Sequence, residues 1–151
     1  MKKTISVISL IFSTIIMISS CSKSETNIIN NPPSTGQASV LWTFNGASFS
    51  SDSSYASANA KSIVAYKDYN SAEKKTVSIY LTSLAVGNYV LTSTPPNTAF
   101  YLVSGTVEHA SLSGTVSITA NTGTRLTGSF TANMAGGVTF TGSFIEVPIR
   151  L

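Results

Sequence analysis

The chain has 151 residues, including nine Lys or Arg, six Asp or Glu, one His and one Cys. A single cysteine excludes an intramolecular disulfide, and a single histidine excludes a metal site built on several imidazoles. The formal charge of +3 includes Lys2 and Lys3, which we expect to be removed with a signal peptide. Seven basic side chains then face six acidic ones, so no basic stripe remains for binding nucleic acid.

The first twenty residues have the layout of a secretory signal peptide. Two lysines precede an uncharged, mainly apolar run at residues 4–18. This run is shorter than the roughly 20 apolar residues that a membrane-spanning helix needs. Small residues and Cys21 follow it in place of a basic flank. We therefore predict that residues 1–20 are removed by cleavage between Ser20 and Cys21.

The sequence Ile18-Ser19-Ser20-Cys21 resembles the lipobox of bacterial lipoproteins. In that family the cysteine sulfur receives a diacylglycerol, the peptide bond before it is cut, and the new amino group is acylated. The resemblance implies a stable anchor on Cys21, because each buried methylene contributes ~0.8 kcal/mol and two or more acyl chains hold firmly. The alternative is an ordinary signal peptide with a chance cysteine. Ser22 replaces the aspartate typical of inner-membrane retention, so we expect the outer membrane, on its periplasmic face or the cell surface.

Residues 22–37 are rich in Asn, Pro, Ser and Gly and have little to bury, so we predict a flexible linker. From residue 38 onward, apolar and polar side chains alternate with the period of two that is typical of β-strands. Val40, Trp42 and Phe44 form the first apolar set, and Asn45-Gly46 then supplies a turn. We predict further strands at 55–60, 62–66, 76–82, 89–91 and 99–103, and a charged loop at 68–75.

The last third of the chain alternates most clearly. Residues of one parity are apolar: Val116, Ile118, Ala120, Leu126, Phe130, Ala132, Met134, Val138, Phe140 and Phe144. Between them lie mainly Ser and Thr, and turn signals at 121–123 and 135–137 separate three strands. No segment from residue 38 onward has a helical period of useful length. We predict that residues 38–151 form an all-β domain, an antiparallel β-sandwich or flattened barrel of eight or nine short strands.

The same parity predicts the register of the last hairpin. A three-residue loop, Ala135-Gly136-Gly137, sets Met134 opposite Val138 and keeps both apolar sets on one face. It also sets Phe130 opposite Gly142 and Phe144 opposite Gly128. Each large ring then covers a glycine across the strand, which stabilises a weak strand position.

Several short motifs follow one another along the mature chain: Asn45-Gly46-x-x-Phe49, Gly87-x-Tyr89, Gly114-Thr115-Val116-x-Ile118, Gly128-x-Phe130 and Gly142-x-Phe144-x-x-Val147-Pro148. Their order resembles a family of small Bacteroidota lipoproteins of unknown function. The resemblance covers most of the mature chain. It implies the all-β class and lipidation, and it implies no activity and no site residues.

Catalytic patterns are weak in this sequence. His109 beside Glu108 is a candidate general base, but we expect a solvated loop histidine. Ser71-Ala72-Glu73-Lys74 matches Ser-x-x-Lys without the companion motifs of that chemistry. The carboxylates beyond the linker are Asp52, Asp68, Glu73, Glu108 and Glu146. Glycosidases need a pair of them, and nothing in their spacing brings two together.

Four aromatic side chains are candidates for ligand contact. Trp42 alternates with Val40 and Phe44, so it belongs either to the core or to a sugar-stacking site. Tyr55, Tyr66 and Tyr69 either line an exposed aromatic platform or form ordinary cross-strand pairs.

We expect an outer-membrane lipoprotein that is not an enzyme and whose β domain binds or organises a glycan or a protein of the envelope. We expect no metal, no nucleic acid and no cofactor besides the covalent acyl and diacylglycerol groups on Cys21. One alternative is a hydrolase that acts on envelope or dietary glycans with carboxylates from different loops. Another is a structural subunit of a surface complex.

Overall fold

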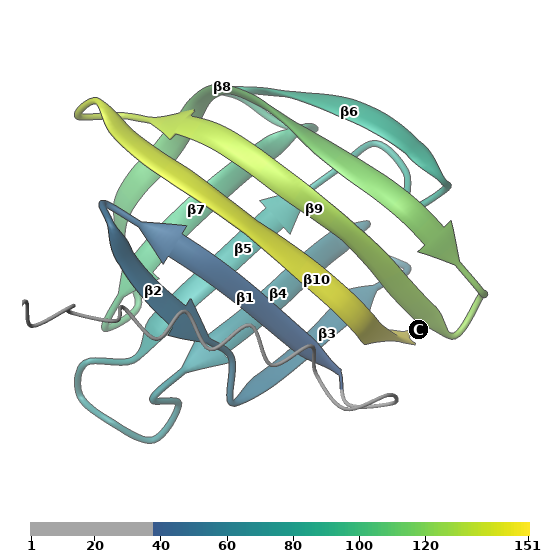
Figure 1. Cartoon of the computed structure of the whole chain (residues 1–151), viewed down its shortest axis with the longest axis horizontal. Helices are drawn as coiled ribbons and strands as arrows, with labels where there is room; N and C mark the ends of the chain where they lie inside the picture. Colours follow the sequence, from purple (N-terminus) through teal and green to yellow (C-terminus); the bar gives the residue numbers. More distant parts are fainter. Residues whose placement is uncertain (1–37) are drawn as a thin grey trace, which may run out of the picture. The chain divides into compact units, whose positions relative to one another are not determined.

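The computed structural model of the chain describes residues 38–151, which form ten strands (Figure 1). The predicted signal peptide, the linker, and the cleavage and lipidation residues Ser20 and Cys21 lie outside this range. No helix of the length and hydrophobicity needed to cross a membrane occurs among residues 38–151. The strands are β1 (Ser39–Phe44), β2 (Ala47–Ser50), β3 (Ser53–Ser57), β4 (Ser62–Lys67), β5 (Lys75–Tyr80), β6 (Gly87–Thr92), β7 (Thr98–Val103), β8 (Thr106–Asn121), β9 (Arg125–Met134) and β10 (Val138–Arg150).

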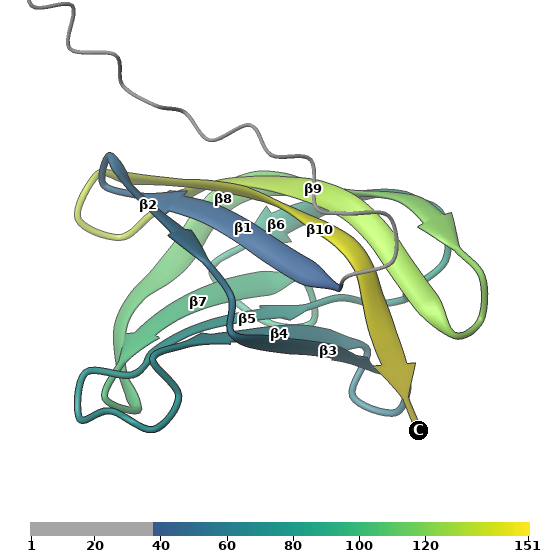
Figure 2. The same ribbon diagram turned by 60° about the horizontal axis from the view of Figure 1, so that its bottom comes forward.

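Seven of these strands close a hydrogen-bonded ring in the order β10-β3-β4-β5-β7-β8-β9, in which β9 pairs with β10 again. Strands β1 and β2 extend the sheet from β10, and β6 pairs with β8. Figure 2 shows two facing layers, with β3, β4, β5 and β7 in one and β2, β1, β10, β9 and β6 in the other. The all-β class is confirmed, as a closed barrel with additional strands.

The predicted number, length and direction of the strands were partly wrong. There are ten strands, and β8 and β10 have 16 and 13 residues, because each runs through both layers. Irregular pairing at residues 111–113 of β8 and 144–147 of β10 marks the bulges that let these strands bend. Beyond its bulge, β10 pairs in parallel with β3 through Ile149 and Arg150, where only antiparallel pairs were expected.

The predicted register of the β9–β10 hairpin is confirmed. Met134 lies opposite Val138, Phe130 opposite Gly142 and Gly128 opposite Phe144. A Cβ atom added to Gly142 would lie 2.5 Å from Cζ of Phe130, and one added to Gly128 would lie 2.4 Å from Cζ of Phe144. The rings therefore cover the glycines as the parity required.

The core lies between the two layers and contains the apolar sets that the alternation selected. Phe130, Phe140 and Phe144 are at most 2% exposed. On the other face of β10, Thr139 is exposed, whereas Thr141 and Ser143 are half-buried because β1 and β9 flank them. The prediction of a buried apolar set is wrong at Ala120, which is exposed. A bulge between Ile118 and Ala120 shifts the alternation of β8 by one residue.

The first predicted turn is confirmed. Asn45 and Gly46 have φ values of 48° and 80°, and Phe44 pairs with Ala47, which is the geometry of a two-residue hairpin. The short edge strand β2 that follows was not predicted. The segment at 99–103 is confirmed as a central strand, because β7 pairs with β5 on one side and β8 on the other.

Candidate functional site

The outer face of the layer β3-β4-β5-β7 carries aromatic side chains. Alternation along each strand sends one set of residues into the core, including Ala56, Ile63, Ile79 and Ala99. The opposite set faces outward and contains Tyr55 on β3, Tyr66 on β4, Tyr80 on β5 and Phe100 on β7. Tyr69 joins them from the loop between β4 and β5. We call these five rings the tyrosine face.

The rings of the tyrosine face form two groups. Centroids of Tyr55 and Tyr66 are 6.4 Å apart, and those of Tyr66 and Tyr69 are 5.1 Å apart. Tyr80 and Phe100 form the second group, with centroids 6.1 Å apart. Val64, which points outward from β4, is only 8% exposed, so the surrounding side chains cover it. The face is therefore a packed apolar surface with phenol hydroxyls on it.

Two basic side chains lie over these rings. The Lys74 ammonium is 5.7 Å from the ring centroid of Tyr66 and 5.2 Å from that of Tyr69. The Arg150 guanidinium is 4.7 Å from the ring centroid of Tyr55. These distances are within the ~6 Å range of a cation–π interaction. Both cations therefore lie over the rings of the tyrosine face.

The environment of Tyr66 is less polar than water. Burial raises the pKa of the Tyr66 phenol to about 12, and the neighbouring Tyr55 hydroxyl adds to the shift. A raised phenol pKa means that the surroundings disfavour the charged phenolate. Tyr66 therefore remains a neutral hydrogen-bonding group at any physiological pH.

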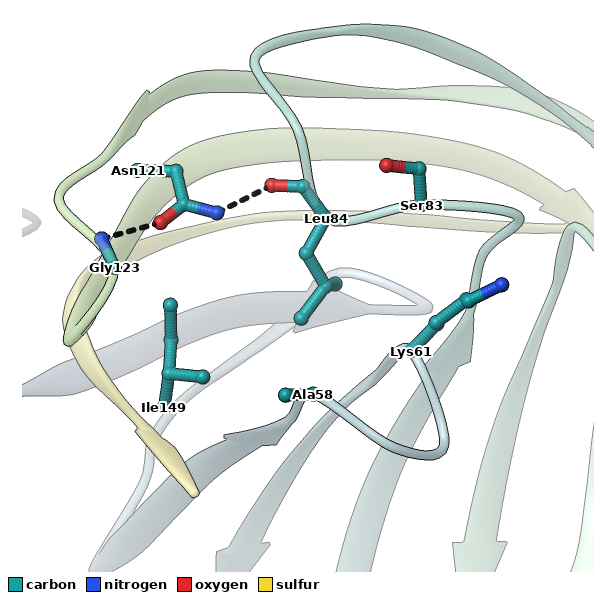
Figure 3. Close-up of a pocket in the computed structure, with 7 residues that line it drawn as sticks. All are labelled: Ala58, Lys61, Ser83, Leu84, Asn121, Gly123 and Ile149. Carbon is teal, nitrogen blue, oxygen red and sulfur yellow. Dashed lines mark hydrogen bonds between the residues drawn. The ribbon is translucent and has the colours of Figure 1, made fainter. Parts of the chain in front are cut away.

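A small hollow lies at one end of the barrel (Figure 3). Its volume is about 300 Å³, the lower end of the range for ligand sites, and Leu84 and Ile149 point into it. The Asn121 amide donates to the Leu84 carbonyl and accepts from the Gly123 N–H, both at 2.7 Å. These bonds fix the Asn121 amide, and Lys61 is the charged side chain in the lining.

Comparison with known proteins assigns the chain to a family. Residues 37–148 match the profile of the family described as "Domain of unknown function (DUF6252)". The chain belongs to this family. No curated protein and no solved structure matches it. The DUF6252 domain spans nearly all of the described residues, which agrees with the expectation of an uncharacterised family.

The structure separates the four aromatic residues predicted as ligand contacts. Tyr55, Tyr66 and Tyr69 lie together on the outer surface of the DUF6252 domain. Trp42 is 2% exposed and its ring stacks on Phe49 at 5.6 Å. Trp42 therefore belongs to the core, the first of the two positions predicted from its alternation, and offers no face to a ligand.

Sequence reasoning missed Tyr80 and Phe100 as members of the tyrosine face. The signal was parity. Tyr80 lies between Ile79 and Leu81, which are both buried, so its side chain points to the other side. Phe100 likewise lies between Ala99 and Tyr101, which are both buried. Because residues 99–103 are apolar on both faces, the sequence already indicated that the outer side of this strand is apolar.

Three of the five carboxylates beyond the linker, Asp52, Asp68 and Glu146, form ion pairs with basic side chains. Asp52 accepts hydrogen bonds from the Lys67 ammonium at 2.8 Å and from the Asp68 N–H at 2.7 Å. These two bonds lower the pKa of the Asp52 carboxyl. A general acid needs the opposite shift. Glu146 lies 3.8 Å from Arg125, on a different part of the domain.

The two other catalytic candidates are engaged in structural contacts. His109 lies in β8, not in a loop as expected, and its Nδ1 donates to the Ala135 carbonyl at 2.6 Å. The Ser71 hydroxyl accepts from the Glu73 N–H at 3.1 Å, which closes a local turn. Lys74 of the Ser-x-x-Lys pattern lies over tyrosine rings. Within residues 38–151, no three His, Cys, Asp or Glu side chains lie close enough to hold a metal ion.

Proposed function

We propose that this protein is a lipid-anchored, non-catalytic binding module of the outer membrane, and that the tyrosine face is its ligand-binding surface. The observation that carries the proposal is a set of five rings on the outer side of a sheet. Tyr69 and Tyr80 are 55% and 39% exposed. Exposed aromatic patches mark interaction sites, and tyrosine is enriched at them because it combines a large apolar ring with a hydrogen-bonding hydroxyl.

The opposite layer shows how an ordinary solvent-facing sheet of this domain is built. One row across it runs through Thr115, Thr131, Thr141, Thr43 and Ser48, each paired with the next. At the β6 edge the row ends in Val90, which is apolar and carries no ring. Thr has a high β propensity, and the hydroxyl groups of Thr and Ser can face water without a bound molecule. Rings on the outer face of β3-β4-β5-β7 are therefore not a requirement of the fold. They support a binding role for that layer.

The absence of a catalytic arrangement from the sequence supports a binding module over a hydrolase. Asp52 and Asp68 both contact Lys67, and the hydrogen bond from Lys67 lowers the pKa of the Asp52 carboxyl. The hollow at the end of the barrel is not lined by a pair of carboxylates. A structural subunit of a surface complex remains the second alternative, and it would also use the tyrosine face as contact area.

A photocrosslinking experiment tests the binding surface in cells. Benzoylphenylalanine in place of Tyr80 reports any molecule that rests on the tyrosine face, because the excited benzophenone inserts into nearby C–H bonds. Benzoylphenylalanine in place of Thr131, which is also exposed but lies on the opposite layer, is the matched control. We expect a discrete adduct from position 80 and none from position 131. Equal labelling from both positions, or no adduct at position 80, would contradict the proposed surface.

The lipid anchor is tested by Cys21→Ser. The lipobox supports attachment through the Cys21 sulfur, so this variant should lose lipidation and signal removal at this site. In a two-membrane bacterium we expect the wild-type protein in the outer-membrane fraction. The variant should be unprocessed or cleaved elsewhere, as electrophoretic mobility and metabolic labelling with a fatty acid would show. Normal maturation and outer-membrane partition of the variant would overturn the lipoprotein proposal.

A further inference from the structure

The cations of the tyrosine face lack acidic partners. Lys67 and Lys75, which lie at the same end of the layer, form ion pairs with Asp52 and Asp68. Neither Lys74 nor Arg150 forms an ion pair within the part of the chain that the structure describes. Each instead rests over tyrosine rings, with Lys74 between Tyr66 and Tyr69 and Arg150 above Tyr55.

We propose that the ligand of the tyrosine face is an acidic polysaccharide, whose anionic groups pair with Lys74 and Arg150 while its sugar rings contact the tyrosines. The inference rests on the binding role proposed above and specifies the class of ligand. A ligand approaching Tyr55, Tyr66 or Tyr69 meets a cation as well as a ring. The cation–π contacts restrict both cations before binding, which reduces the entropy that an ion pair with the ligand would otherwise lose.

The geometry of the rings favours a flexible chain over a flat crystalline surface. Ring planes of Tyr55 and Tyr66 are inclined by 37°, and those of Tyr66 and Tyr69 by 69°. No single plane can therefore stack on all three rings. Their centroid separations of 6.4 and 5.1 Å are close to the length of one sugar unit, so neighbouring sugars of a twisted chain can contact neighbouring tyrosines.

The balance of charge favours an acidic polysaccharide over nucleic acid. Two cations without acidic partners would release few counterions from a nucleic acid, whose binding depends on many phosphate contacts. The phenol hydroxyls and the outward Ser53 and Ser78 on β3 and β5 suit the hydroxyl groups of a polysaccharide. Glu73, next to Lys74, is an acidic side chain that would weaken the binding of an anion at this position, and it lies exposed in the loop. Asp68, next to Tyr69, is paired with Lys67 and Lys75.

Matched pairs of polymers test the inference on the full-length lipoprotein in detergent. Polygalacturonate and its fully methyl-esterified form share a backbone and differ in charge, and dextran sulfate and dextran differ in the same way. We expect affinity electrophoresis to show binding to polygalacturonate and at least tenfold weaker binding to the ester. Dextran sulfate against dextran shows whether sulfate can replace carboxylate.

Variants then locate the binding site. Lys74→Ala and Arg150→Ala should each lower the affinity for polygalacturonate about tenfold, which corresponds to the loss of one charge-assisted hydrogen bond. Lys74→Arg should keep most of the affinity for polygalacturonate, because it preserves the positive charge. Lys61→Ala, which removes an exposed cation at the barrel hollow, is the control and should bind as the wild type does. Unchanged thermal unfolding would show that the variants remain folded.

Three results would overturn the acidic polysaccharide as ligand. These are equal binding to charged and neutral polymers, no binding to either acidic polymer, or full binding by the Lys74→Ala, Arg150→Ala double variant. The benzophenone adduct at position 80 decides the binding role separately. An adduct that contains a protein instead of a polysaccharide would support the surface and overturn this class of ligand.

Discussion

Phe144→Ala will destabilise the domain by ~3–5 kcal/mol, the usual cost of replacing a buried phenylalanine by alanine. The Phe144 side chain is 0% exposed, and its ring lies against Gly128 on β9. Gly128 has no side chain that could move into the cavity that the ring leaves. A domain is typically stable by about 5–15 kcal/mol, so this variant will lose much of its margin. Urea unfolding followed by the fluorescence of Trp42, the only tryptophan, measures the change.

Thr141→Ala is the matched control on the same strand. Thr141 points to the opposite side of β10 and is half-buried between β1 and β9. Its replacement should change the free energy of unfolding by no more than about 0.5 kcal/mol. If the two variants cost the same, or if Thr141→Ala costs more, the assignment of faces on β10 is wrong.

The terminal hairpin shows why part of this fold could be predicted from the sequence. A strand has a side-chain period of two, so a slip of one residue moves every apolar side chain to the wrong face. Three strands are separated by glycine-containing turns, and their apolar residues all have even numbers, so few registers keep these residues on one face. The pairing of Phe130 with Gly142 then followed from this parity and from the length of the loop. The Asn45-Gly46 turn was predictable for a similar reason, since its left-handed backbone favours these two residues.

Parity fails where a bulge resets it. Ser111 is buried and Leu112 is 57% exposed, because β8 passes from one layer to the other at this point. A bulge inserts one extra residue into one strand of a pair. This residue can be of almost any type, so the apolar pattern of the sequence does not reveal where the bulge lies. The lengths of β8 and β10, the parallel contact of β10 with β3 and the exposure of Ala120 all follow from such irregularities.

The candidate site was partly predictable for a related reason. Tyr55, Tyr66 and Tyr69 could be grouped because two of them lie in successive strands and the third lies in the loop that follows. The grouping of Lys74 and Arg150 with them could not be predicted. Arg150 reaches Tyr55 only because the end of β10 pairs with β3, which brings together residues from opposite ends of the domain.

Gly128→Ala tests how closely β8 and β9 approach each other. A Cβ atom on Gly128 would lie 2.1 Å from the Ser117 carbonyl oxygen and 2.4 Å from Cζ of Phe144. The nearer atom belongs to the backbone of β8, so a side-chain rotation cannot relieve the collision. Overpacking of this kind costs ~1–3 kcal/mol or more, and we expect the urea midpoint to fall accordingly. Ser129→Ala, at the exposed neighbouring position, should stay within about 0.5 kcal/mol.

A second substitution separates the two collisions at Gly128. Phe144→Leu shortens the side chain that covers the glycine and removes the ring atoms from the site of the new methyl group. In a double-mutant cycle, Gly128→Ala should therefore cost less in the Phe144→Leu background than in the wild type. The relief must be incomplete, because the Ser117 carbonyl stays in place. Full relief would show that the ring alone excludes a side chain at position 128. A wild-type urea midpoint for Gly128→Ala would show that β9 lies farther from β8, and the register of the barrel would then need revision.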